Sequence, residues 1–510
     1  MRKFLLVIAF LFVVVPVKAN DIYVAQIAAG AGNGTDCADA RDLAWFNNSG
    51  NWGTGSSQIG PGTTVHLCGT FNAPAGLNNY MSMQGSGSSG NPITIKFETN
   101  AILQAPYWGA VIYIGNSSYI TIDGGTNGII RATDNGTLLG NHHDGGIAVY
   151  SPLGGSNLTV KNLTVENLYV HSCTPPVSSC TDELGGNTNG ILLGGGNNQL
   201  ITNNTIHDVK WAISYSMAGA SASNVTISNN TAYNADHGIF TTDGNNANGA
   251  VMNGLYIYGN NWHDAANWDD AANNFHHDCT HNDLSHSGTS AVNVFIYNNY
   301  CYGNWGQHMN AAVYLSSAYG SYVATVFNNV LVAGPGSGLG CGMICSLSGV
   351  SASVFNNTII GTGPAFGVAM HFYGPSSIFE NNVVESVYEA ISRSDPGVLQ
   401  TVDYNTYYNV GSGGWSQVSF SGWQGYGWDA HGSYSNPNLS SSNVPTSSST
   451  ALIKKGANLG GLSITQLNVD KAGNARPILP TNWDIGAYQY GSGGTSSSVA
   501  PPANLVASVQ

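Results

Sequence analysis

The chain has 510 residues, of which only 8% are charged, and its formal net charge is −14 at pH 7. A nucleic-acid-binding protein needs a basic patch, and this composition offers none, so we expect no nucleic-acid partner. The chain has 66 glycines and few helix-forming windows. This pattern favours an all-β protein built from many short strands and turns.

Residues 1–20 have the pattern of a secretory signal peptide. Arg2 and Lys3 form a charged start, residues 4–15 form an apolar run, and Ala19 is a small residue at the expected cleavage site. The apolar run is short for a membrane span, although a lone amino-terminal anchor is the alternative. No later segment is apolar enough to cross a bilayer. We expect a secreted, extracellular or cell-surface protein with no membrane span after signal removal.

The eight cysteines of an exported chain suggest disulfide bonds. Eight cysteines allow 105 connectivities, so the sequence does not fix the pairing. Proximity along the chain favours four pairs, and free buried thiols are the alternative. The pairs are Cys37–Cys68, Cys173–Cys180, Cys279–Cys301 and Cys341–Cys345.

The first part of the mature chain, residues 21–84, is predicted to form an amino-terminal cap and the first coils of the fold. Short strands are expected at 23–26 and 64–67, with a short helix within 39–47. Further alternating segments predict strands at 93–97, 111–114, 119–123 and 128–132.

Residues 157–384 contain an explicit repeat, with segments such as VTISNNT, ATVFNNV and ASVFNNT. The spacing of the recurring asparagine is irregular, which indicates one structural unit with variable loops. We expect the asparagine to make a turn and to pair with the same residue of the coils above and below. A β-branched or aromatic residue two positions earlier should point inward. The recurring positions are Asn162, Asn203, Asn229, Asn260, Asn298, Asn328, Asn356 and Asn381.

A coil of this kind cannot bury its apolar face alone, so the coils must stack as a parallel β-helix. The asparagine turns resemble those of the right-handed parallel β-helix superfamily that includes pectate lyases and polygalacturonases. Weaker signals extend the resemblance from Tyr23 to Tyr490, and GSGSSGNPITIKFE and WDIGAYQY are similar to segments of secreted bacterial members. The resemblance implies an all-β, right-handed, single-stranded parallel β-helix over 21–490. It does not imply one activity, because this scaffold hosts lyases, hydrolases, epimerases, adhesins and tailspikes.

The end of the chain departs from the repeat. Residues 404–490 are rich in tyrosine and tryptophan and are predicted to form the last coils and a carboxy-terminal cap. Residues 491–510 form a tail rich in glycine, serine and proline, of the kind that behaves as a flexible linker. We expect a monomer.

The best candidate site is the segment 255–310, which interrupts the repeat with a concentration of histidine, aspartate and tryptophan. Eight of the 14 histidines lie between His207 and His308. Pairs such as His207–Asp208 and His263–Asp264 follow equivalent turns and are predicted to stack in one row that forms a groove. The alternative is a polar ladder that serves packing alone. The candidate catalytic residues are Asp269, Asp270, His276, His277, Asp278 and His281.

Two reactions fit these residue types. Glycosidic hydrolysis needs two carboxylates across the bond, for which Asp269–Asp270 and Asp278 are the candidates. The Asn-Thr-Asp, Gly-His-Gly and Arg-Ile-Lys elements of polygalacturonases are absent. β-Elimination needs a base, for which His276, His277 or His281 would serve, and a cation. No Lys or Arg occurs between Lys210 and Arg393, so neutral glycans suit this acidic chain better than acidic ones.

A cofactor would most simply be Ca²⁺, held by Asp269, Asp270 and Asp278. A zinc site at His277 and His281 is disfavoured, because a four-residue spacing shares a face only on a helix. Exposed indoles on the interrupting loop would stack on sugar rings, whereas buried ones would fill the core. The candidate substrate-binding residues are Trp262, His263, Trp268, His237, Trp305 and His308.

Two functions from different classes remain open. The first is an exported carbohydrate-active protein that binds and cleaves an extracellular polysaccharide in a groove on the flank of the β-helix. The second is a non-catalytic surface protein of the adhesin type. A catalytic site predicts that the imidazoles and carboxylates converge, and a structural role predicts that they lie spread along the helix.

Overall fold

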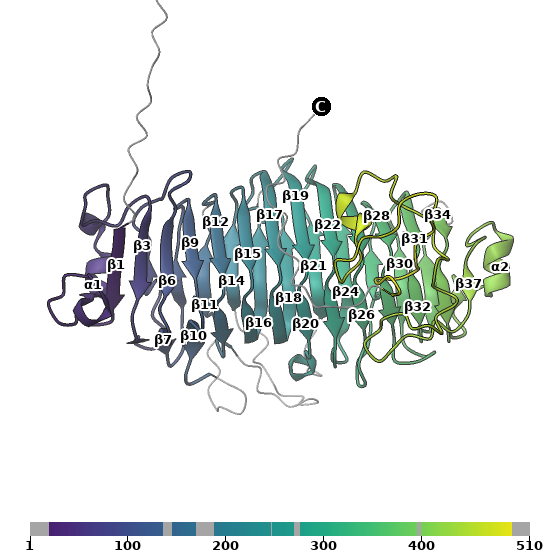
Figure 1. Ribbon diagram of the computed structural model, residues 1–510, viewed down its shortest axis with the longest axis horizontal. Coiled ribbons are helices and arrows are strands. Elements are labelled where there is room, and N and C mark those ends of the chain that lie inside the picture. Colours follow the sequence, from purple (N-terminus) through teal and green to yellow (C-terminus); the bar gives the residue numbers. More distant parts are fainter. Residues whose placement is uncertain are drawn as a thin grey trace, which may run out of the picture.

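The computed structural model describes residues 20–135, 145–152, 154–169, 188–245, 247–269, 276–394 and 399–491. The predicted signal peptide up to residue 19 and the tail from residue 492 lie outside these ranges. The described residues form one long stack of coils whose strands run side by side across the molecule (Figure 1). Within these ranges no helix is both long enough and apolar enough to cross a membrane.

The first face of the stack is a sheet of 14 parallel strands, each paired with the equivalent strand of the next coil. Its members precede the asparagine turns. In spatial order they are β2 (Arg41–Asp42), β1 (Asn20–Ala25), β3 (Thr63–Leu67), β6 (Ile93–Phe97), β9 (Ile120–Asp123), β12 (Leu158–Lys161), β15 (Gln199–Thr202), β17 (Ala222–Ser228), β19 (Val251–Tyr258), β22 (Ser290–Tyr297), β25 (Ser321–Phe327), β28 (Val350–Phe355), β31 (Ser377–Glu380) and β34 (Leu399–Asp403).

The second face follows the turn. It contains short strands that also pair in parallel from coil to coil. They are β4 (Thr70–Asn72), β7 (Ile102–Ala105), β10 (Ile129–Ala132), β13 (Thr164–Glu166), β20 (Asn261–His263), β23 (Tyr300–Tyr302), β26 (Val330–Val332), β29 (Thr358–Ile360), β32 (Val383–Glu385), β35 (Thr406–Tyr408) and β37 (Ser433–Tyr434).

The third face completes each coil, and it carries the candidate site. Two long strands, β16 (Thr205–Ser216) and β18 (Thr231–Thr242), run through both the second and third faces and join them into one sheet. The remaining strands of the third face are β5 (Met81–Ser82), β8 (Ala110–Tyr113), β11 (Ile147–Ser151), β14 (Asn189–Gly194), β21 (His277–Leu284), β24 (Met309–Ser317), β27 (Ile344–Ser346), β30 (Val368–Phe372), β33 (Glu389–Arg393) and β36 (Gly414–Trp415).

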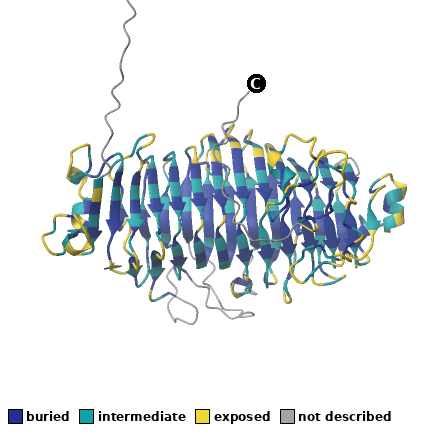
Figure 2. Cartoon of the chain, viewed as in Figure 1, coloured by how far each residue is buried: buried dark blue, intermediate teal, exposed yellow. Residues whose placement is uncertain are grey.

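The main core is a long apolar column inside the coil, and Figure 2 shows the buried residues along its strands in dark blue. Two smaller apolar clusters lie where residues 439–485 pack on the stack. Strand register places like residues above one another. Ile213 pairs with Ile239, which is followed by Thr280, Val313 and Ile344 in successive coils. All of these side chains are buried. The prediction of an all-β parallel β-helix is confirmed.

The asparagine turns divide their work between two adjacent positions. The first position has a left-handed backbone, as at Asn229 and Asn328, and glycine takes it at Gly259. Left-handed φ costs little for asparagine and glycine, which explains why these two residues recur there. The second position forms a buried amide ladder, which sequence reasoning had not separated from the first. Its members are Asn204, Asn230, Asn260, Asn299, Asn329, Asn357, Asn382 and Asn405.

Asn329 shows how one ladder residue is satisfied. Its amide nitrogen donates to the carbonyl of Ile296 at 2.9 Å and to Oδ1 of Asn357 at 3.0 Å. Its Oδ1 accepts from the backbone and side-chain nitrogens of Asn299, both at 3.0 Å. The side-chain nitrogen and oxygen of Asn329 therefore both have partners, as buried polar groups require.

The two ends of the chain are finished differently. Helix α1 (Leu43–Asn47) lies at the first coils and helix α2 (Phe420–Gly425) at the last ones (Figure 1). Residues 404–490 were predicted to form the last coils and a carboxy-terminal cap. Strands β35 to β37 are indeed the last strands of the stack, whereas the segment that follows Tyr434 runs back along its flank (Figure 1). There Arg476 donates to Oδ1 of Asn328 at 2.8 Å, and Ala457 donates to Oδ1 of Asn381 at 2.8 Å. This segment covers the turn residues of earlier coils.

Three of the four expected disulfides are present. The Cα atoms lie 5.6 Å apart in Cys37–Cys68, 6.3 Å apart in Cys279–Cys301 and 5.9 Å apart in Cys341–Cys345. The second of these ties β21 to β23 of the next coil. The pair Cys173–Cys180 lies outside the described residues.

We predict that Asn329→Ala destabilises the protein by about 3 kcal/mol or more, because it removes the oxygen that accepts the backbone N–H of Asn299 and the amide that donates to the Ile296 carbonyl. Asn253 is exposed, and its Oδ1 accepts a hydrogen bond from the side-chain nitrogen of Asn293 at 2.7 Å. Asn253→Ala is therefore the matched control. The denaturant midpoint of unfolding measures both. Equal midpoints for the two variants would contradict a structural role for the ladder.

The ladder ends on Asp429, and this carboxyl gives a second prediction. Burial raises its pKa to about 6 from 3.8, against the opposing hydrogen bonds from Tyr407, Asn405 and Trp423. Its Oδ1 accepts from Asn405 at 2.9 Å, as a ladder asparagine would. Because the folded state holds this proton more tightly than the unfolded state, stability from this group is present below about pH 4 and is lost as the pH rises to about 6.

The variant Asp429→Asn removes that titration. We expect the thermal midpoint of the natural protein to fall relative to that of the variant as the pH rises from 4 to 6. Thermal melts at a series of pH values measure this difference. A difference that stays constant over this range would show that Asp429 keeps an ordinary pKa.

Candidate functional site

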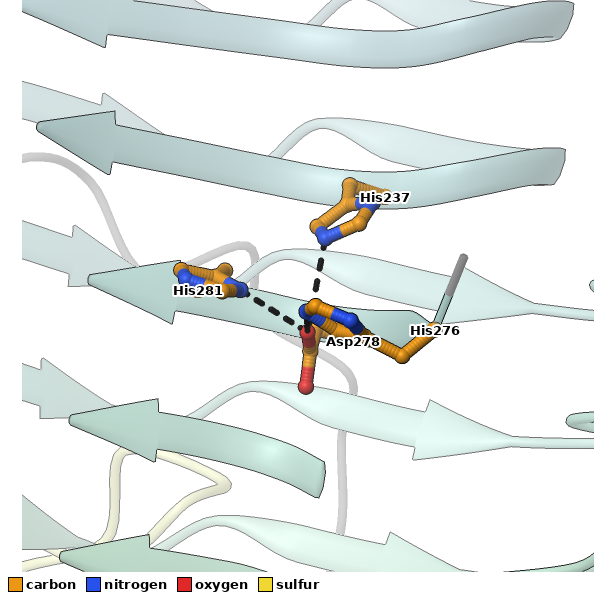
Figure 3. A group of neighbouring side chains, drawn as sticks. All are labelled: His237, His276, Asp278 and His281. Atoms are coloured by element: carbon orange, nitrogen blue, oxygen red, sulfur yellow. Dashed lines mark hydrogen bonds and ion pairs between the residues drawn. The ribbon is translucent and has the colours of Figure 1, made fainter. Parts of the chain in front are cut away.

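Four side chains meet on the third face, and Figure 3 shows them pointing toward one another. His237 comes from β18, His276 lies directly before β21, and Asp278 and His281 lie within β21. Oδ2 of Asp278 lies 2.9 Å from Nδ1 of His281, 3.4 Å from Nε2 of His237 and 3.4 Å from Nε2 of His276. We call these four residues the histidine cluster.

Strand register explains why residues so far apart in sequence converge. β18 and β21 pair so that His237 stands opposite Asp278. In the pairing of β21 with β24 the register shifts between His277 and Asp278. This irregularity coincides with the point where the side chains of His276, Asp278 and His281 gather around one carboxylate oxygen. Local irregularities of this kind are common beside functional sites.

A second carboxylate extends the cluster into the protein. Asp236 bonds Nδ1 of His237 at 2.9 Å and Nδ1 of His277 at 2.6 Å. His277 in turn bonds Asp269 through Nε2 at 3.0 Å. Oxygens of Asp269 also accept the backbone N–H groups of Gln307 and His308. Carboxylates and imidazoles therefore alternate from Asp269 to the histidine cluster.

This alternation fixes the charges. Burial lowers the pKa of His237, but Asp236 and Asp278 outweigh it and raise that pKa to about 10. Burial likewise lowers the pKa of His277, but its carboxylate partners Asp236 and Asp269 outweigh burial and raise that pKa to about 9. Burial raises the pKa of Asp236 and Asp278, but the imidazoles hold both below their usual range. In the absence of any bound cation, protons on these imidazoles balance the buried carboxylates.

His276 differs from the other members. Burial lowers its pKa, and the neighbouring His237 and His281 add to this effect against the attraction of Asp278. Its side chain is 45% exposed, whereas that of His281 is 10% exposed and that of Asp278 is fully buried. His276 is thus the edge at which the histidine cluster meets solvent.

Aromatic rings border the histidine cluster. The ring of Tyr314 lies 4.4 Å from that of His281, and the ring of Phe240 lies 5.1 Å from it. Trp211 meets His237 edge-on and stacks on Phe240. These contacts hold the imidazoles in place from outside the coil.

An open hollow of about 490 Å³ lies beside the cluster on the third face, and we call it the groove. Register places Tyr314 next to His281 in one row, and the same row continues through Cys345 to His371. Tyr314, which lines the groove and contacts His281, therefore links the groove to the histidine cluster. Its lining residues are Asn310, Tyr314, Gly340, Cys341, Leu347, Ser348, His371 and Tyr373.

The six predicted catalytic residues separate into three groups. The structure brings His276, Asp278 and His281 together in the histidine cluster. It buries His277 and Asp269 behind that cluster, where they bond to other side chains and to backbone. Asp270 lies outside the described residues.

The His–Asp pairs were predicted to stack in a single row, but in the structure they belong to two separate groups. His207 and His263 belong to a column on the second face, in which Tyr233 stacks between them at 4.5 and 5.0 Å. His237 belongs instead to the histidine cluster. His308 lies one coil beyond His277, whose backbone N–H donates to the His308 carbonyl at 3.0 Å.

The three tryptophans predicted to stack on sugar do not lie on the surface. Trp262, Trp268 and Trp305 are 3%, 2% and 0% exposed. Trp262 and Trp305 pack in the core column, and Trp268 packs against Tyr169 while its indole N–H donates to the Asn234 carbonyl. Buried rings offer no face to a ligand, so the sugar-stacking prediction is wrong for these indoles.

Sequence reasoning missed the aromatic side of the site. Tyr314, His371 and Tyr373 line the groove, and Asp236 orients two imidazoles. The three groove residues lie in no motif, because loops of different length separate them along the chain. Only the alignment of β24 and β30 with β21 would have indicated that they are neighbours. Asp236 directly precedes the candidate His237 in the sequence, and what the sequence did not indicate is its bond to His277.

The predicted calcium site depends on which oxygens of Asp269 and Asp278 are available as ligands. Ca²⁺ takes six to eight oxygen ligands. Among the described residues, the oxygens of Asp269 are engaged by His277 and by two backbone N–H groups, and Asp278 is surrounded by imidazoles. The only group of potential metal ligands among the described residues is the histidine cluster, whose ligand atoms lie within 4.8 Å of one another.

Comparison with known proteins shows similarity of structure only. No protein-family model and no curated protein sequence matches the chain. A crystal structure of pectate lyase Pel9A is 15% identical, covers 93% of this chain and 98% of its own, and gives a TM-score of 0.46. The complex of XylC with xylose is 11% identical in sequence, covers 92% of this chain and 98% of its own, and has a TM-score of 0.41. DFA-IIIase from Arthrobacter chlorophenolicus A6 is 12% identical in sequence, covers 74% of this chain and 89% of its own, and has a TM-score of 0.38.

At these identities no activity is transferred to this chain. Its own stacked sheets, parallel throughout from coil to coil, carry the assignment. The chain is a parallel β-helix protein.

Proposed function

We propose that this protein is exported, binds a polysaccharide chain in the groove of the third face, and cleaves it beside the histidine cluster. The observation that carries the proposal is that the cluster and the groove are continuous, with Tyr314 contacting His281 and also lining the groove. Converging imidazoles and carboxylates favour a catalytic site over an adhesin-type surface. The three disulfides support export, because such bonds persist in oxidising compartments.

The groove has the chemistry that sugars require. Tyr373 is 39% exposed and its ring packs on that of His371 at 4.2 Å, which gives an aromatic surface for the apolar face of a pyranose. Asn310 and Ser348 add polar groups for hydroxyls. The stack of parallel strands also makes the face long in one direction, which suits a polymer rather than a small molecule.

The reaction best supported is elimination rather than hydrolysis by two carboxylates. Paired-carboxylate hydrolysis needs both groups to reach the bond. Asp269 and Asp278 are buried and already bonded to imidazoles and backbone. A histidine base is therefore the better choice among the described residues. It would take the C5 proton of a uronate residue while the C4–O bond breaks, and the leaving oxygen would take a proton from water. The substrate class for this reaction is a uronate-containing glycan, not the neutral glycan that the net charge alone favours.

We assign the proton acceptor to His308. This residue is half-buried, its backbone carbonyl accepts the N–H of His277 behind the histidine cluster, and it precedes the groove residue Asn310 by two positions. It is not a member of the histidine cluster, so its imidazole is not committed to Asp278.

The test is an assay of the purified protein on a panel of neutral and acidic glycans, with unsaturated products and reducing ends both measured. We expect unsaturated products from at least one glycan. His308→Ala should lower kcat by about 10²–10⁴-fold, the usual contribution of a general base, with KM little changed. Tyr373→Ala should raise KM several-fold with kcat little changed.

The matched control is His431→Ala, which removes an exposed histidine bonded to Asp403 at 2.7 Å on a different part of the chain. It should behave like the natural protein. Absence of binding and of cleavage across the whole panel would contradict the proposed function. Reducing ends without unsaturated products would contradict elimination and favour hydrolysis.

A further inference from the structure

The histidine cluster has the geometry of a metal site, which goes beyond the proposed cleavage reaction. Four-coordinate Zn²⁺ with bonds of about 2.0–2.1 Å separates neighbouring ligand atoms by about 3.3 Å. The three imidazole nitrogens lie 2.9, 3.4 and 3.4 Å from Oδ2 of Asp278. All four ligand atoms lie within 4.8 Å of one another, so side-chain rotations that shorten the longest of these distances would place them around one ion.

The hydrogen bonds leave the right atoms free for a metal. Oδ1 of Asp278 accepts from the backbone N–H of Ala311 at 2.9 Å, so Oδ2 is the oxygen that faces the imidazoles. Nδ1 of His237 bonds Asp236, which directs Nε2 into the cluster. A carboxylate behind a ligating imidazole is the usual arrangement in metal sites, where it sets the tautomer and the ring orientation.

His276 provides an independent indication. Its Nε2 is shielded from solvent and has no hydrogen-bond partner. That atom points at the same oxygen as the nitrogens of His237 and His281 (Figure 3). A buried ring nitrogen without a partner is costly. A cation shared by the three nitrogens and the carboxylate would satisfy all of them at once.

We propose that His237, His276, Asp278 and His281 bind one divalent first-row transition ion. Three imidazoles and one carboxylate suit Zn²⁺ and its neighbours, whereas Ca²⁺ and Mg²⁺ take oxygen ligands. The bound ion places positive charge at the end of the groove. Residues 211–392 contain no lysine and no arginine, so no side chain of that stretch could supply this positive charge.

The test is titration of the metal-stripped protein with Zn²⁺ by calorimetry and with Co²⁺ by visible absorption. We expect one equivalent of Zn²⁺ per chain and an intense Co²⁺ spectrum, the signature of four-coordinate geometry. His276→Ala should weaken Zn²⁺ binding more than about tenfold. Because His276 is the most exposed member, this variant is expected to fold, which circular dichroism checks. Asp236→Asn should weaken binding about 10–100-fold through the orientation of His237.

His431→Ala again serves as the control and should bind Zn²⁺ as the natural protein does. Absence of one-equivalent binding, or equal affinity in His276→Ala and the natural protein, would overturn the metal site. These measurements use no glycan, so their failure is separate from failure of the proposed function. Metal binding without cleavage of any glycan would leave the site standing and remove the proposed activity.

Discussion

The structure depends on coils that stack in register. A single coil has an apolar face that it cannot cover, and the next coil covers it only if like positions lie above one another. The amide ladder enforces this alignment, because each ladder asparagine bonds both the previous coil and the next one, as Asn329 does with Asn299 and Asn357. A slip of one residue would reverse which side chains face the core and would break every bond of the ladder.

The same register builds the candidate site. His237 and Asp278 belong to different coils and meet because β18 and β21 pair in parallel. His281 and Tyr314 meet for the same reason in β21 and β24. The disulfide between Cys279 and Cys301 ties this part of the third face to the next coil. A rigid scaffold of this kind can hold buried imidazoles and carboxylates together, even though their desolvation is unfavourable without mutual pairing.

The fold was readable from the sequence because its determinants are local and repeated. The left-handed turn residue Asn328 and the buried Val326 two positions before it have counterparts of similar residue type in successive coils. The site was only partly readable. Asp278 and His281 stand out by residue type, but the bond between Asp236 and His277, which lie 41 positions apart, is one that no spacing reveals.

The errors have physical causes. The interrupting segment could be a loop or a strand on the sequence alone, and in the structure His277–Leu284 is a strand of the third face. Its alternation was hidden because nearly every residue of that strand is polar and yet buried. The tryptophans were placed on the surface because aromatic residues near polar ones suggest a sugar platform. In the structure all three are buried instead, and the groove is lined by the half-buried Tyr314 and the exposed Tyr373.

The central claim is that one continuous surface on the third face joins the histidine cluster to a polysaccharide-binding groove. A crystal structure of the protein with a bound oligosaccharide tests it most directly. The account predicts sugar rings over Tyr314 and Tyr373, with one glycosidic bond beside His276 and His308. Sugar bound on the first or second face, with the groove of the third face empty, would contradict it.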